Sequence, residues 1–186
     1  SGKIEDGEAL LAPLRRLGRP LADIVMRRPY AQMQSLLDAT QPKGRRYYWK
    51  SHYLPRVDAE AVAVLTEHAA RLPSPHSAIL LFQIEGALAE RPAGYSPAGN
   101  RDATFVINIA ASWENAADDA ACLRWSRDCF EATRAFSTGG TYINFLTEDE
   151  GPERTKAALG KGVERLASIK SKWDPENVFR TNRNIR

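Results

Sequence analysis

The sequence predicts an α+β fold in which helices cover one face of an antiparallel sheet and the other face stays open. Three segments alternate in hydrophobicity and are rich in aromatic or β-branched residues, as half-buried strands are: residues 45–54, 77–88 and 104–113. The stretches around them carry apolar residues at three- and four-residue spacing, which indicates amphipathic helices. With 186 residues and a hydrophobic content of 43%, the chain is long enough to bury one core.

The chain begins with a predicted helix and an irregular connection. Residues 4–17 repeat leucine on one helical face; Pro13 inside this pattern predicts a kink, and Gly18 predicts its end. Residues 19–44 contain further prolines and keep no period, so we expect them to be mostly irregular.

The polar side chains of the three strands are expected to share the open face of the sheet. Side chains alternate between the faces of a strand, and the registers that we draw bring together one polar set. This set comprises Tyr48, Lys50, His52, Gln83, Glu85 and Asn108. One face of an antiparallel sheet is often simply wet, whereas the aromatic density of residues 45–54 favours a binding surface. Both interpretations stay open at this point.

Two helices are expected to cover the other face. Asp58 is a predicted N-cap, followed by an apolar stripe that runs to Leu72. Residues 115–136 form the second helix, with Cys122 and Cys129 on its apolar side. These cysteines lie two turns apart, roughly 10 Å along a helix axis, which is too far for a disulfide. We therefore interpret them as free thiols in the core.

The carboxyl-terminal part is predicted to contain a short strand, a helix and a polar tail. Residues 141–146 follow two glycines and read as a strand, and apolar spacing from Leu159 to Trp173 indicates a helix. Asp174 can then cap a short new turn. The remaining residues, 180–186, have no periodicity, so this end is either solvated or docked against another surface.

Composition and motifs exclude several classes of function. The net charge is only +3, and 26 basic residues are interspersed with 23 acidic ones, which does not indicate nucleic-acid binding. The three histidines lie apart, so no metal site is expected. No glycine-rich phosphate loop, nucleophile elbow, signal peptide or membrane-length apolar run is present. We expect a soluble, cytoplasmic protein, while secretion of a longer form stays open.

The final residues carry a more specific signal. The run WDPENVFRTNRNI begins at Trp173 and resembles the carboxyl-terminal signature of the berberine-bridge-enzyme-like FAD-linked oxidases of the vanillyl-alcohol-oxidase superfamily, close to YDPxNxFRxNQNI. Trp173 stands for the usual Tyr, and Arg183 for the usual Gln. Four further runs resemble the substrate-binding domain of these enzymes: RRPYAQMQSLLDATQPKGRRYYWKSHYL, SAILLFQIEGALAE, NRDATFVINIAASWE and STGGTYINFL.

The resemblance implies a carboxyl-terminal fragment of a flavoenzyme. Residues 1–146 would be a substrate-binding domain that is incomplete at its start, and residues 147–186 would return to the flavin side, together forming one compact unit. The cofactor would be FAD, and most of its site would lie in an amino-terminal domain that is the expected partner of this chain. The sheet of the substrate domain would roof the flavin ring.

The resemblance also implies site residues. The motif positions expected to face the flavin are Tyr142, Asn144, Asn182 and Asn184. An amide offers both a donor and an acceptor, which suits the imide edge of a flavin. Candidate substrate-binding residues on the sheet are Tyr48, Lys50, His52, Gln83 and Asn108.

The chain departs from the family pattern at positions that concern catalysis. The Tyr that acts as a base in many members is Phe145 here, and a phenyl ring cannot accept a proton. Tyr48, Lys50 and His52 are then the candidates for a base, and the catalytic residue stays unknown. Glu85 and Asn100 stand where glycine and His are common, so an unusual substrate is expected.

The expected function is that of an FAD-dependent oxidoreductase that transfers hydride from a small organic substrate, such as a sugar, alcohol, phenol or secondary metabolite, to flavin N5, with oxygen as acceptor. The chain alone is expected to show no turnover. The alternative is a non-catalytic α+β ligand-binding or protein-interaction module that uses the open sheet face.

Overall fold

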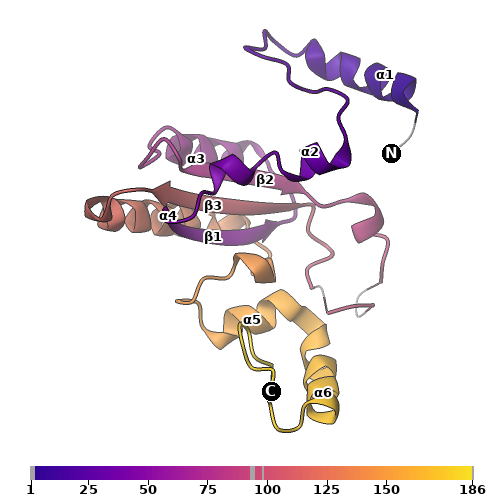
Figure 1. The fold of residues 1–186 in the computed structure, drawn as a ribbon, viewed down its shortest axis with the longest axis vertical. Helices are drawn as coiled ribbons and strands as arrows, with labels where there is room; N and C mark the ends of the chain where they lie inside the picture. Colours follow the sequence, from indigo (N-terminus) through magenta and orange to yellow (C-terminus); the bar gives the residue numbers. More distant parts are fainter. Residues whose placement is uncertain (1–2, 93–94, 98, 186) are drawn as a thin grey trace. The chain divides into compact units, whose positions relative to one another are not determined.

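The computed structural model describes residues 3–92, 95–97 and 99–185. The chain forms two compact units, Ser1–Pro42 and Lys43–Arg186. The first unit contains helix α1 (Ile4–Arg15), the short helix α2 (Tyr30–Gln34) and a 3₁₀ turn η1 (Asp38–Thr40) (Figure 1). Arg15 binds Glu8 and Asp23, which ties the end of α1 to the irregular segment that follows it. The predicted division between residues 146 and 147 stays a prediction.

The second unit is built on a three-stranded antiparallel sheet. The strands are β1 (Arg46–Leu54), β2 (Ala78–Gln83) and β3 (Phe105–Trp113), in the spatial order β1-β3-β2. The central strand β3 supplies two fully buried apolar side chains, Ile107 and Ile109, each with 0% exposure. Burying each of these side chains contributes about 1.5–3 kcal/mol to stability.

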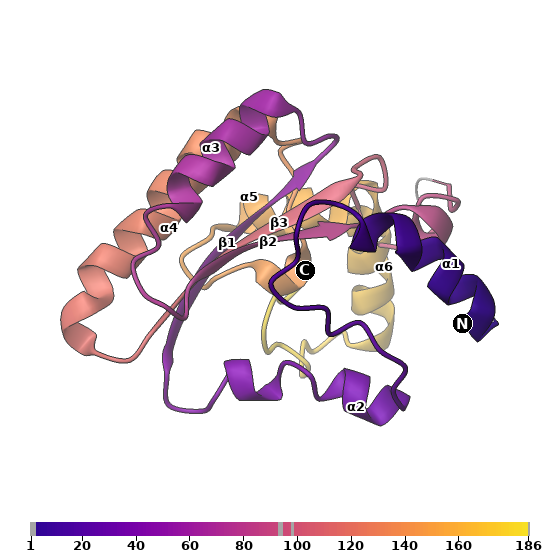
Figure 2. The same ribbon diagram turned by 90° about the horizontal axis from the view of Figure 1, so that it is seen from above.

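Two helices pack along one face of this sheet. They are α3 (Ala59–Ala69) and α4 (Asp119–Thr133), which run side by side over the strands (Figure 2). The Asp58 side chain accepts a hydrogen bond from the Ala61 amide at 3.0 Å, which confirms the predicted cap. Cys122 and Cys129 are buried and free, as predicted, and burial raises the pKa of Cys129 to about 12. The predicted α+β class is therefore confirmed.

The predicted set of polar residues on the open face is wrong for β1 and β2. Tyr48, Lys50 and His52 pair with Ala111, Ile109 and Ile107, so they lie on the face that α3 and α4 cover. Gln83 pairs with Phe105 and lies in the same register. The rows on the opposite face include Tyr53, Val106 and Phe82. We call this second face the pocket face.

The predicted strand at residues 141–146 is also wrong. The chain makes the 3₁₀ turn η5 (Ile143–Phe145) there, and the backbone hydrogen bonds to β1 near Tyr53 come from Thr138 and Gly140, which precede this stretch. The Tyr53 amide donates to Gly140 O at 3.3 Å, and the Thr138 amide donates to Tyr53 O at 2.9 Å.

The carboxyl-terminal segment continues beyond the β1 edge of the sheet as α5 (Pro152–Leu159), η6 (Gly160–Gly162) and α6 (Val163–Trp173) (Figure 1). Asp174 precedes a short turn, as predicted, in which the Asn177 amide donates to Asp174 O at 3.0 Å. Its carboxylate accepts hydrogen bonds from the Val178 and Phe179 amides at 2.7 and 3.0 Å, and so holds a loop.

Short 3₁₀ turns complete the second unit: η2 (Gly86–Leu88), η3 (Ala116–Asp118) and η4 (Arg134–Phe136). In the described part of the chain, no helix combines the length and the apolar character needed to traverse a lipid bilayer.

Candidate functional site

The pocket face holds an apolar cavity of about 400 Å³. Tyr53, Val106 and Phe82 form one row across the three strands and make its floor. The other lining residues come from the loops around the sheet: Ile84, Leu88, Gly99, Asn100, Arg101, Tyr142 and Phe145. The volume lies within the range of small-molecule sites, which are mostly apolar with a few polar groups.

Turn η5 closes one side of this cavity. Phe145 packs edge-on against Tyr142, with ring centroids 5.1 Å apart and an interplanar angle of 86°, and its centroid lies 6.1 Å from that of Phe82. Asn144 Nδ2 donates to the Tyr142 hydroxyl at 2.8 Å. The structure therefore brings together two of the predicted flavin-facing residues, Tyr142 and Asn144, and puts the Tyr142 ring on the wall of the cavity.

Tyr53 supplies a second hydroxyl at the cavity. Burial raises the pKa of Tyr53, and the neighbouring Tyr142 raises it further, so the phenol keeps its proton at neutral pH. Sequence reasoning placed Tyr53 on the opposite face from the polar set but did not single it out. The sequence signal for Tyr53 is that it and Phe82 are aromatic residues in two segments of alternating hydrophobicity. Pairing both segments with the strand at residues 104–113 puts the two rings on one face.

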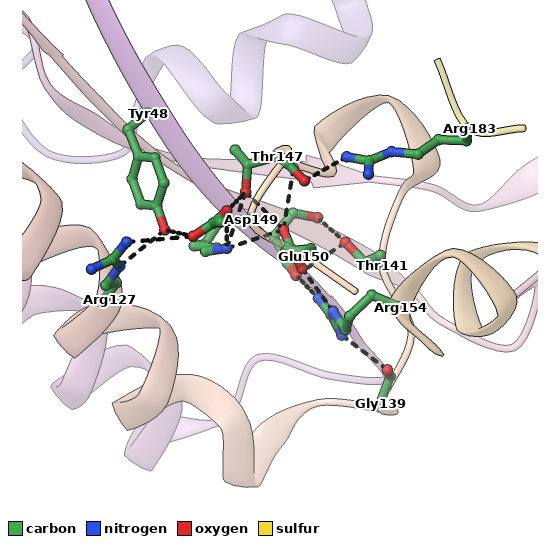
Figure 3. A network of polar contacts seen from close by, with 11 residues as sticks. Tyr48, Arg127, Gly139, Thr141, Thr147, Asp149, Glu150, Arg154 and Arg183 are labelled. Atoms are coloured by element: carbon green, nitrogen blue, oxygen red, sulfur yellow. Dashed lines mark hydrogen bonds and ion pairs between the residues drawn. The ribbon is translucent and has the colours of Figure 1, made fainter. Parts of the chain in front are cut away.

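Tyr48 lies in a polar network at the edge of β1 (Figure 3). Lys50 belongs to the same network, and neither residue lines the cavity. Lys50 Nζ donates to Thr147 Oγ1 and Asp149 Oδ1, each at 3.0 Å, and lies 3.4 Å from Glu150 Oε1. The Tyr48 hydroxyl donates to Asp149 Oδ2 at 2.7 Å. Burial by itself would lower the pKa of Lys50, but the bond to Asp149 and the charge of Glu150 outweigh it and raise that pKa.

Arginines complete this network. Arg127 binds Tyr48 and Asp149, and Arg154 Nε donates to Glu150 Oε2 at 2.8 Å. Arg154 also donates to the backbone carbonyls of Ser51 and Gly139, at 2.9 and 3.1 Å. The network therefore fastens the segment that leads into η5 and α5 to the edge of the sheet.

His52 is buried under α4. Its ring stacks on Phe130 with centroids 4.0 Å apart, and its Nε2 donates to the Phe130 carbonyl at 3.0 Å. Burial lowers the pKa of His52 to about 4. A neutral imidazole on the covered face does not reach the cavity, so His52 packs the core.

The two remaining polar candidates from the sheet are separated. Gln83 is exposed and donates to Glu85 Oε2 at 2.6 Å. Asn108 lies on the pocket face between Ser51 and Leu80, with 8% exposure. Its Oδ1 is buried and accepts no hydrogen bond from any described residue.

The asparagines of the tail lie in a tight turn. Asn182 adopts a left-handed conformation with φ 59°, and the Asn184 amide donates to Asn182 O at 3.2 Å. Asn184 Oδ1 is buried and has no donor among the described residues. Between them, Arg183 donates from Nη2 to Thr147 O at 2.5 Å, which joins the tail to the β1-edge network. Residues 183–185 are half-buried and attached through Arg183 to Thr147, whereas residues 180–182 are exposed.

Proteins that resemble this chain in sequence are named as FAD-linked oxidoreductases or oxidases. Residues 141–186 match the family described as "Berberine and berberine like". An FAD-linked oxidoreductase of Dictyostelium discoideum is 23% identical over 188 residues, covering 100% of this chain and 41% of that protein. The aclacinomycin-N/aclacinomycin-A oxidase of Streptomyces galilaeus is 28% identical over 166 residues, covering 80% of this chain and 29% of the oxidase.

A solved structure shares the fold. BBE-like 1 of Physcomitrella patens superposes with a TM-score of 0.77 at 18% identity, covering 100% of this chain and 43% of the moss protein. The chain thus spans less than half the length of these relatives. Residues 141–186 thus match the berberine-like family, the relatives in sequence are named as FAD-linked oxidoreductases or oxidases, and the fold is that of a BBE-like protein.

Proposed function

We propose that this chain forms the substrate side of an FAD-dependent oxidoreductase. When bound, FAD would supply a hydride acceptor at N5 for a small organic substrate, with oxygen as the final electron acceptor. The observation that carries the proposal is the cavity on the pocket face. It is lined jointly by the strands and by Tyr142 and Phe145, which lie in the segment that matches the berberine-like family. The oxidase named for aclacinomycins supports a small-molecule substrate.

The residues present fit a flavin. A flavin ring edge offers one N–H donor beside two carbonyl acceptors, and the buried, unpaired Oδ1 of Asn184 is an acceptor that such a donor would satisfy. In this proposal Tyr142, Asn144, Asn182 and Asn184 hold the ring, and residues beyond this chain hold the rest of the cofactor. We therefore expect the chain alone to show no turnover.

The cavity residues would orient the substrate rather than remove its proton. Phe145 has no atom that can accept a proton, and Tyr53 keeps its own at neutral pH. We propose that the Tyr53 hydroxyl binds a substrate oxygen while Phe82, Val106 and Phe145 exclude water. No proton transfer is assigned to Tyr48, Lys50 or His52, because none of them lines the cavity.

A visible spectrum tests where the flavin site lies. The purified chain, mixed with excess FAD and then desalted, should elute without a flavin absorbance band, because too few groups of this chain reach the cofactor. A longer protein that carries this chain should retain the band. A stable band on the chain alone would show that the proposed division of the flavin site is wrong. Failure of the longer protein to retain FAD would favour a non-catalytic ligand-binding module.

A matched pair of variants tests the cavity. Phe82 and Leu81 are neighbours with similar exposure, 43% and 45%, but Phe82 lines the cavity and Leu81 lies on the other face. With 2-naphthamide as a neutral aromatic probe, Phe82→Ala should weaken binding roughly tenfold by removing apolar contact area. Leu81→Ala should leave the dissociation constant unchanged. Equal effects of the two changes would contradict the assignment of the substrate site to this face.

A further inference from the structure

Arg101 introduces a positive charge into the wall of a mostly apolar cavity. It lies in the loop that leads into β3, and two of its nitrogens support that loop. Nη1 donates to Leu88 O and Nη2 donates to Ser96 Oγ, both at 2.7 Å. Sequence reasoning noted this position only through its neighbour Asn100 and did not select Arg101 as a site residue.

The hydrogen-bonding capacity of Arg101 is only partly used. A guanidinium carries five N–H donors and no acceptor. Its Nε is buried and has no hydrogen-bond partner within residues 3–92, 95–97 and 99–185. Over the same residues, Arg101 forms no ion pair with a carboxylate, whereas Arg127 and Arg154 each do.

An unmatched cation beside apolar side chains is costly unless an acceptor reaches it. Burying a charged donor without a partner costs more than burying a neutral one, and charge-assisted bonds to oxygen are about twice as strong as neutral bonds. The other residues that line the cavity include no carboxylate, and their polar side-chain groups are the Asn100 amide and the Tyr53 and Tyr142 hydroxyls. An anionic oxygen for Arg101 would therefore come from a ligand.

We infer that Arg101 is a specificity-determining residue that selects substrates carrying a carboxylate or another anionic oxygen on an aromatic or apolar body. The inference rests on the proposed function, because it takes the cavity to be the substrate site. The apolar floor of Tyr53, Val106 and Phe82 binds the body of the molecule, and the Arg101 guanidinium binds its anionic end. This adds a charge requirement to a site whose shape alone would accept neutral compounds.

A pair of probes that differ only in charge tests the inference in the chain itself. 2-Naphthoate and 2-naphthamide have nearly the same shape, and their dissociation constants can be measured by titration calorimetry without any flavin. Wild type should bind the carboxylate at least about tenfold more tightly than the amide, as expected for a charge-assisted bond. This preference should fall as salt is added, because exposed parts of the interaction are screened.

Variants separate recognition from support of the loop. Arg101→Met should abolish the preference for naphthoate while leaving the affinity for naphthamide unchanged; Arg101→Gln provides the same neutral change should the Met variant not fold. Arg101→Lys keeps the charge but not the two-point support, and should retain a several-fold preference. Arg56→Gln is the control, because Arg56 pairs with Asp58 on the surface with 79% side-chain exposure.

The outcomes distinguish this inference from the function on which it rests. Equal binding of both probes by wild type, or an undiminished preference in the neutral variants, overturns the role of Arg101 alone. An equal loss of affinity for both probes in Arg101→Met and Arg101→Lys also overturns the role of Arg101 in anion recognition. That result is expected if Arg101 only supports the loop. If wild type binds neither probe, the proposed substrate site fails, and the role of Arg101 fails with it.

Discussion

Replacing Glu150 with Gln is expected to lower the free energy of unfolding by about 3 kcal/mol. The Glu150 side chain is only 6% exposed and lies between Arg154 and Lys50, with N–O distances of 2.8 and 3.4 Å. Burial by itself would raise the pKa of Glu150, but Arg154 and Lys50 outweigh it and lower that pKa, so the group is ionised at neutral pH. The amide would leave Lys50 with Asp149 alone, and Arg154 with no carboxylate among the described residues, which is why the effect should be large. Denaturant unfolding at pH 7 measures it.

Glu153→Gln is the matched control for this change. Glu153 lies one turn away on α5, pairs with Lys156 at 3.1 Å and is 82% exposed. The same substitution there should change stability by no more than about 0.5 kcal/mol. If Glu150→Gln and Glu153→Gln had the same free energy of unfolding, the β1-edge network would contribute little to stability. The attachment of η5 to the sheet would then depend on apolar packing alone.

The buried His52 should make the protein lose stability as the pH falls from about 6.5 to about 4, by a total of about 3 kcal/mol from this residue. Its folded-state pKa lies below its ordinary value of 6.5, so in this window the unfolded chain binds a proton that the folded chain does not. The contribution is therefore fully present above pH 6.5 and is lost on acidification. The Nε2–H group of His52 already donates a hydrogen bond to Phe130 O, so a second proton would bind at Nδ1. That nitrogen is buried and has no acceptor among the described residues.

His52→Gln should flatten the stability profile between pH 6.5 and 4 compared with wild type. Denaturant midpoints measured across this range give the two slopes. Only their difference is assigned to His52, because the folded-state pKa values of Asp149 and Glu150 are also lowered, so these carboxylates take up protons in the unfolded chain at a higher pH than in the folded one. His76→Gln removes an exposed imidazole and should keep the wild-type slope. An unchanged slope in the His52 variant would mean that this ring takes up a proton without leaving its site under α4.

The sequence was sufficient for the elements whose cause is local. The hydrophobic alternation of residues 105–113 predicts β3, and Asp58 followed by an apolar stripe predicts α3, because a period and a cap lie within one segment. The free thiols follow in the same way from their helical spacing. The berberine-like tail was also recognisable, since its signal is a continuous run of residues.

The faces of β1 could not be predicted because their cause is distant. Lys50 and His52 look like solvent-facing residues in a local pattern, but Lys50 extends along the sheet edge to carboxylates at Asp149 and Glu150, and His52 finds an aromatic neighbour in Phe130. These partners lie far along the chain and are specified by the tertiary fold. The same reasoning explains the cavity, whose aromatic members come from β1, β2 and η5 and share no sequence motif.

The bonds at the outer edge of β1 also bear on solubility and on where this chain can be shortened. An edge strand with free amides and carbonyls is a template for pairing with strands of other molecules. Here the segment that carries Thr138 and Gly140 occupies the backbone of Tyr53, and the Arg154 guanidinium occupies the Ser51 carbonyl. A chain truncated before residue 138 would keep all three strands and both covering helices but would lose this shield. Such a product should self-associate through β1, because Thr138, Gly140 and Arg154 would no longer cover the outer edge of that strand.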